Sequence, residues 1–171
     1  MKIRCAVPQD LPAILEIITL AKEGLAAHGV DQWQDGYPNR AQLAADIESG
    51  RSYVGVFAEK ICAVTMISFD ADPNYAVIEN GAWTREAPYC VLHRVAVHPT
   101  YRNRRCAAEL LAFATQMCAE RGISYLRIDT HLDNKPMRGF LEKSNFRQCG
   151  MIYLDNLHDE THARVAYDRC L

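Results

Sequence analysis

The chain has 171 residues, of which 49% are hydrophobic and 23% are charged, and its formal net charge is −2 at pH 7. These values predict one soluble globular domain over residues 1–171 and give no general attraction to nucleic acid or to a membrane surface. No apolar run approaches the roughly 20 residues of a membrane-spanning helix. We therefore expect neither nucleic acid nor membrane as a partner.

Seven cysteines are dispersed along the chain, and no two have Cys-x-x-Cys spacing. An odd, scattered set argues against a disulfide framework, and the missing ligand spacing argues against a zinc site. The N-terminal residues turn polar at Gln9-Asp10, unlike a signal peptide. We expect a reduced, cytoplasmic protein without a metal.

Strand and helix patterns alternate along the chain. Asp10 is placed to cap the first helix, in which Leu11, Ile14 and Ile18 recur at helical spacing. The expected strands are residues 3–6, 53–58, 61–69, 89–97, 125–130, 148–154 and 164–169. The expected helices are residues 11–25, 41–49, 106–120 and 135–143. Turn formers mark residues 31–39 and 70–88 as irregular.

The strand–helix–strand unit over residues 89–130 predicts a right-handed crossover between parallel strands. The two strands on either side of Glu59-Lys60 predict an antiparallel hairpin. Together they indicate the α/β class, with a mixed central sheet and helices on both faces.

A local cluster of positive charge follows one of these strands. The strand ends at His98-Pro99, a turn with Arg102, Arg104 and Arg105 comes next, and an Ala/Leu-rich helix begins at once. Backbone N–H groups at a helix start, together with arginines, favour a phosphate or pyrophosphate ligand. The alternative is a solvated basic helix start.

This segment resembles the cofactor-binding motif of the GNAT N-acetyltransferase superfamily. That motif is Arg/Gln-x-x-Gly-x-Gly/Ala at a helix start, and residues 102–107 match it except at Arg105, where Gly is usual. Residues 134–146 are similar to the family's Asn-led helix that ends in Gly-Phe, with Asn145 in place of Gly. The N-terminal residues 3–14 also resemble a common GNAT start.

The resemblance implies the GNAT-like acyl-CoA N-acyltransferase fold and acetyl-CoA as co-substrate. It implies that the backbone of one strand pairs with pantetheine, that the arginine turn cradles the pyrophosphate and that Asn134 contacts CoA. The implied cofactor-binding residues are Val95, Ala96, Val97, Arg102, Asn103, Arg104, Arg105, Cys106, Ala107 and Asn134. Plainer readings are a buried strand for residues 95–97 and a helix N-cap for Asn134. Arg105 is expected to keep a helical backbone and to bind phosphate through its guanidinium.

The general acid and base are less clear in the sequence. Many GNAT enzymes have a tyrosine acid where this chain has Leu141. Tyr153, on the next strand, is one candidate acid, although an ordinary half-buried tyrosine is the plainer reading. His93 is a candidate base, since a histidine's ordinary pKa of about 6.5 suits proton abstraction and strand alternation puts it on the face of Val95 and Val97. His131 is the second candidate, and bound water is a third.

The acceptor is expected to enter between two loops. Trp33 and Tyr37 on one loop, and Glu79 on the other, are candidate substrate contacts. Asp70, Asp72 and Glu86 make the second loop acidic. A packed Trp33 and solvated surface charges are the plainer reading, and selection of a cationic amine is the alternative.

The sequence thus predicts an acyltransferase that moves an acetyl group directly from acetyl-CoA to a primary amine. The acceptor is a small molecule or a peptide, and a homodimer is possible. The alternatives are a non-catalytic acyl-CoA-binding module, motivated by Leu141 and Arg105, and a phosphate- or nucleic-acid-binding protein, which the small basic patch disfavours.

Overall fold

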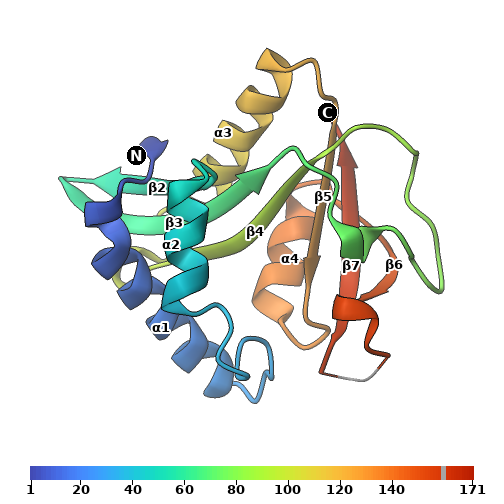
Figure 1. Ribbon diagram of the computed structural model, residues 1–171, viewed down its shortest axis with the longest axis horizontal. Coiled ribbons are helices and arrows are strands. Elements are labelled where there is room, and N and C mark those ends of the chain that lie inside the picture. Colours follow the sequence, from blue (N-terminus) through green and yellow to red (C-terminus); the bar gives the residue numbers. More distant parts are fainter. Residues whose placement is uncertain (159–160) are drawn as a thin grey trace.

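The computed structural model describes residues 1–158 and 161–171 and has a mixed sheet of seven strands with helices on both of its faces (Figure 1). The strands are β1 (Lys2–Cys5), β2 (Ser52–Phe57), β3 (Lys60–Ser68), β4 (Cys90–Val97), β5 (Tyr125–Thr130), β6 (Arg147–Tyr153) and β7 (Ala163–Cys170). The helices are α1 (Leu11–Ala26), α2 (Arg40–Glu48), α3 (Cys106–Glu120) and α4 (Lys135–Lys143). Each lies within two residues of the predicted bounds, so the expected fold class is confirmed.

The strand order is β1-β2-β3-β4-β5-β7-β6, and only β4 and β5 are parallel neighbours. This confirms the crossover through α3. The parallel pair is short, because its register covers only Cys90 opposite Leu126 and Val91 opposite Arg127. Beyond Val91 the two strands separate, and the edge of β4 that faces β5 is left without a strand partner in the described sheet.

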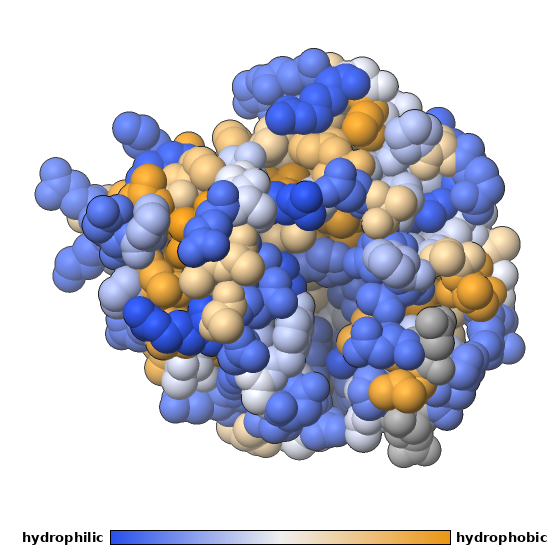
Figure 2. Space-filling model, in the orientation of Figure 1, coloured by the Kyte–Doolittle hydropathy of each residue, from blue (hydrophilic) through white to orange (hydrophobic). Residues whose placement is uncertain are grey.

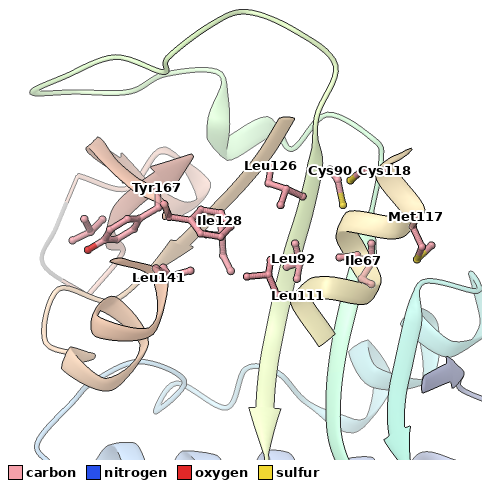
Figure 3. Packing of buried hydrophobic residues seen from close by; sticks show 13 residues of the cluster. Ile67, Cys90, Leu92, Leu111, Met117, Cys118, Leu126, Ile128, Leu141 and Tyr167 are labelled. Carbon is pink, nitrogen blue, oxygen red and sulfur yellow. The ribbon is translucent and has the colours of Figure 1, made fainter. Parts of the chain in front are cut away.

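The two faces of the sheet carry separate cores. Helices α1 and α2 pack Ile14, Ile18 and Ile47 against Val54 and Val64. Helices α3 and α4 cover the other face, where buried side chains of the sheet pack against both helices (Figure 3). The labelled members of this second cluster are Ile67, Cys90, Leu92, Leu111, Met117, Cys118, Leu126, Ile128, Leu141 and Tyr167.

No helix among the described residues is long and apolar enough to cross a membrane.

A β-bulge interrupts β4. Met66 pairs with His93 and Val64 with Ala96, so Thr65 alone stands opposite both Arg94 and Val95. Arg94 has φ 53°, in the left-handed region. One extra residue shifts the alternation of side chains between the two faces of a strand.

The bulge corrects the predicted placement of His93. Val95 and Val97 pack beside Cys106 and Leu110 on the α3 face. The ring of His93 instead lies 6.1 Å from that of Tyr75, on the opposite face. The expectation that His93 shares a face with the two valines is therefore wrong.

The irregular segment 70–88 is held against the sheet by Asp168 of β7. The backbone N–H and the hydroxyl of Thr84 donate to this carboxylate over 2.6 and 2.8 Å, and the Tyr125 hydroxyl donates over 2.6 Å. Burial opposes ionisation of Asp168, but these hydrogen bonds prevail and lower its pKa to about 2. The segment can thus carry residues into the site without regular structure of its own.

Candidate active site

One cavity of about 1420 Å³ runs from the start of α3, past the separated part of β4, to the loop before α2. Its walls include Arg102 and Ala107 at one end and Trp33, Tyr37 and Asp72 at the other. Figure 2 shows this face of the molecule hollowed near its centre, with hydrophilic side chains around the opening. The cavity is therefore long enough to join the predicted phosphate turn to the predicted acceptor loops.

The turn before α3 presents open backbone N–H groups. The first backbone hydrogen bond of the helix is donated by Glu109 to the carbonyl of Arg105. Among the described residues, no acceptor meets the N–H groups of residues 105–108. Such groups at a helix N-terminus bind anions, and the helix dipole adds to the attraction.

Arg105 differs from the expectation. It lies at the N-cap position with φ 61° and ψ 15°, in the left-handed region and not in the right-handed helical one. This is the conformation that glycine adopts without strain. The glycine of the family motif is thus replaced by an arginine that keeps a glycine-like backbone.

The arginines of the turn point in different directions. Arg102 lines the cavity, and its guanidinium lies against Gly24 of α1. A Cβ added to Gly24 would lie only 3.2 Å from Nη2 of Arg102. Arg104 instead stacks over Phe57 and Tyr101, with its guanidinium carbon 5.6 and 5.7 Å from their ring centres. Of the turn residues, Arg102 and Ala107 line the cavity, whereas Asn103, Arg104, Arg105 and the buried Cys106 do not.

Asn134 is a helix cap whose other side-chain group binds a loop. Its Oδ1 accepts from the N–H of Met137 over 3.2 Å, which confirms the predicted N-cap of α4. Its Nδ2 donates over 2.8 Å to Oε1 of Gln32, which also accepts from the hydroxyl of Thr130. Sequence reasoning missed Gln32, because a glutamine in a polar loop gives no sign that it will be buried.

His93 lies at the centre of a half-buried polar cluster. Its Nε2 is 2.9 Å from Oδ2 of Asp72, and its Nδ1 is 3.9 Å from Oδ1 of Asp129. The Tyr75 hydroxyl donates to the same Oδ1 of Asp129 over 2.7 Å. His93, Asp72 and Asp129 all line the cavity.

The geometry fixes the protonation pattern of this cluster. Burial opposes ionisation of Asp72, but hydrogen bonds from His93 and Asn74 outweigh it and hold its pKa below the ordinary value. An ionised carboxylate only accepts hydrogen bonds, so Nε2 of His93 carries the proton towards Asp72. In the neutral ring, Nδ1 is then the free acceptor, on the side of Asp129.

His131 has a different environment. It is buried, it does not line the cavity, and its Nδ1 accepts from the N–H of Asp133 over 3.2 Å. Burial, and then the nearby charge of Arg164, lower its pKa. His131 therefore has a structural hydrogen bond at the end of β5 and lies outside the cavity lining.

Tyr153 and Glu79 both contact His158, away from the cavity. The ring of Tyr153 stacks on that of His158 at 4.5 Å, and Glu79 lies 3.3 Å from Nδ1 of the same histidine. They line a separate pocket of about 70 Å³. Leu141, where the family often has its tyrosine acid, is buried in the core.

The two aromatic residues predicted for the acceptor do line the cavity. Tyr37 accepts a hydrogen bond from Arg94, the residue of the β-bulge. Arg94 in turn forms a buried ion pair with Asp46 of α2, with Nε 2.8 Å from Oδ2. Trp33 packs against the core on the same side. The bulge thus ties the acceptor loop to the sheet.

The acidic loop is only partly at the cavity. Asp70 and Asp72 line it, and Asp70 is paired with Arg51 over 2.5 Å. Glu86 points to solvent, 3.6 Å from Arg127. Among the described residues, no group of three or more His, Cys, Asp or Glu is arranged to hold a metal ion.

Comparison with known proteins agrees with this geometry. The model of the acetyltransferase (GNAT) family matches residues 12–146, and the chain therefore belongs to that family. It is an acyltransferase, and its co-substrate is acetyl-CoA. Among curated proteins, none matches the sequence significantly.

Solved structures show the same fold. A GNAT-family acetyltransferase from Streptococcus agalactiae is 29% identical, with a TM-score of 0.86 over 99% of this chain and 95% of that one. A GNAT-family acetyltransferase from Listeria monocytogenes is 17% identical, with a TM-score of 0.71 over 99% and 94%. PaiA N-acetyltransferase from Thermoplasma acidophilum, solved with coenzyme A, is 15% identical, with a TM-score of 0.72 over 99% and 98%.

Proposed function

We propose that the protein transfers the acetyl group of acetyl-CoA directly to a primary amine bound at the Trp33–Asp72 end of the cavity. One observation carries this proposal: a single cavity joins the open N–H groups before α3 to His93, whose ring is hydrogen-bonded to Asp72. Direct transfer needs donor and acceptor held in one space beside a base. A small molecule or a peptide can supply such an amine.

The chain's own residues would hold CoA as follows. The pyrophosphate lies at the N–H groups of residues 105–108 and on the guanidinium of Arg102. The pantetheine amides pair with the open edge of β4 along Val95–Val97, because β5 has separated from that edge. The side chain of Asn134 is already used by Met137 and Gln32, so its part is to fix the start of α4 beside the pantetheine.

The acetyl transfer then requires a proton acceptor. An alkylamine has an ordinary pKa of about 10.4 and must lose a proton to attack. Nδ1 of His93 takes that proton, while Asp72 stabilises the resulting imidazolium. The neutral amine nitrogen forms a bond to the thioester carbon, the carbon–sulfur bond breaks, and CoA leaves as a thiolate. The second proton of the attacking nitrogen passes to solvent as the amide forms. Asp129, 3.9 Å from the same Nδ1, attracts the incoming ammonium.

No tyrosine acid is needed in this scheme. A thiol has a pKa of about 8.5, so its thiolate is a tolerable leaving group near neutral pH. Leu141 is in the core and Tyr153 lies in the other pocket. We therefore propose that the thiolate leaves without protonation by either residue.

The test is turnover. Acetyl-CoA together with a primary amine should give free CoA thiol and an acetylated amine, measured by a thiol reagent and by mass spectrometry. The alternative of a non-catalytic acyl-CoA-binding module, which the family membership does not favour, predicts CoA binding without thiol release. That result would overturn the proposal.

We further propose a cytoplasmic location. The thiols of Cys90 and Cys118 lie side by side in the core (Figure 3), and both are free. Neighbouring thiols persist in a reducing compartment. A homodimer stays a prediction, with β1 as the edge strand open to pairing. The outer edge of β6 is partly covered, because Glu79 and Ala82 form backbone hydrogen bonds with Met151 and Cys149. Light scattering would decide the oligomeric state.

A further inference from the structure

A buried arginine lies at the acceptor end of the cavity. Arg164 of β7 is only 7% exposed and lines the cavity. Its Nη1 donates to the backbone carbonyls of Thr161 and Ala163 over 2.8 and 2.9 Å. Its Nε and Nη2 have no acceptor, and it forms no ion pair, among the residues that the structure describes. A guanidinium stays charged in proteins, so an anion is favoured beside these two nitrogens.

The strand register places Arg164 near the proposed amine site. Asp129 of β5 stands opposite Ala166 of β7, so Arg164 is its diagonal neighbour on the same face of the sheet. Diagonal neighbours lie about 7–8 Å apart. The charges of Asp129, Asp31 and Asp35 act on Arg164, but none of these three carboxylates is paired with it. One end of the cavity therefore holds negative charge near His93 and, a short distance away, a positive charge that has no ion-pair partner among the described residues.

We propose that the acceptor is a zwitterion, an amino acid whose amine lies between Asp129 and His93 and whose carboxylate pairs with Nε and Nη2 of Arg164. This inference rests on the proposed amine acetylation. Two parallel N–H groups of one guanidinium match a carboxylate in a bidentate pair. If Arg164 instead only balances the charge of the aspartates across the cavity, a carboxylate on the acceptor does not raise kcat/KM.

The first test needs no variant. The wild-type enzyme is given acetyl-CoA and matched acceptors with and without a carboxylate: alanine with ethylamine, and lysine with its decarboxylated diamine. We expect kcat/KM to be about 10- to 100-fold higher for the amino acid of at least one pair, as for other hydrogen bonds to a charged group. Equal values within both pairs would overturn the inference.

The second test removes the charge. Arg164→Gln should abolish the preference for the amino acid, so that kcat/KM becomes equal for the two members of each matched pair. Arg164→Lys should restore part of the preference. Arg169→Gln is the matched control, since Arg169 lies on the same strand outside the cavity. Thermal unfolding and CoA titration establish that each variant is folded.

A third readout is independent of turnover. Calorimetric titration of the CoA-bound wild type with the preferred amino acid should show binding that Arg164→Gln weakens by about 10-fold or more. Amine acetylation with no effect of the carboxylate in any arm would refute the zwitterion and leave the proposed function in place. Absence of thiol release with every amine would refute the proposed function itself.

Discussion

At the residue scale, the site depends on a hydrogen bond between residues 21 positions apart. Asp72 reaches His93 because the irregular segment around it folds back over β4 and β5. Asp72 N–H donates to the Tyr89 hydroxyl over 2.8 Å, and Asp72 itself caps the short turn Pro73–Tyr75. These contacts fix the carboxylate that orients the proposed base.

Replacement of that base tests its role. His93→Ala should lower kcat by about 10²–10⁴-fold, the usual contribution of general-base catalysis, and leave CoA affinity near normal. Steady-state kinetics at saturating acetyl-CoA and amine provide the measurement. His158→Ala, an exposed histidine outside the cavity, is the control. Unchanged turnover in a folded His93→Ala protein would refute the assignment.

Tyr153 gives the opposite prediction. Because its ring stacks on His158 in a separate pocket, Tyr153→Phe should leave kcat and its pH profile unchanged to within about twofold. Kinetics at saturating acetyl-CoA and amine would measure this. A loss of 10-fold or more on the basic side would show that Tyr153 protonates the leaving thiolate after all, and that the segment carrying it moves during turnover.

At the scale of elements, the turn before α3 separates two arginines that the sequence treats alike. Arg102 faces the cavity and Arg104 stacks on Phe57 and Tyr101. Arg102→Glu should therefore weaken CoA binding by about 10-fold or more, since it places a carboxylate beside the pyrophosphate. Arg104→Glu adds the same charge outside the cavity and should have a much smaller effect. Calorimetric titration with CoA compares the two, and equal affinities would remove Arg102 from the phosphate site.

The sequence predicted the elements well and their finer geometry less well. Periodicity located the helices and strands to within two residues, and the arginine turn together with Asn134 indicated the family. The sequence did not predict the bulge at Arg94. The positive φ of this arginine is set by packing and by the ion pair with Asp46, and not by a local preference of arginine. Contacts such as His93 with Asp72, or Asn134 with Gln32, join distant segments. Residue order alone does not show them.

At the scale of the whole molecule, Asp168 joins β5, β7 and the segment 70–88. Its folded pKa of about 2 lies below the ordinary value of 3.8, so its contribution is present above about pH 4 and is lost as pH falls towards 2. The difference corresponds to about 2 kcal/mol of unfolding free energy.

Acid unfolding tests this anchor. Asp168→Asn should be less stable than the wild type near pH 7 by about 2 kcal/mol, and the gap should narrow towards pH 2. Denaturant unfolding at several pH values measures it, with Glu23→Gln, an exposed carboxylate, as control. A gap that stays constant from pH 7 to pH 2 would show that the charge of Asp168 contributes nothing.

The central claim is that one cavity brings acetyl-CoA and an amine together beside His93. The most direct measurement follows free CoA thiol and acetylated amine together, with the wild-type protein, acetyl-CoA and a panel of primary amines and amino acids. We predict thiol release that depends on the amine and equals the acetylated product mole for mole. CoA binding without amine-dependent release, across the whole panel, would contradict the account.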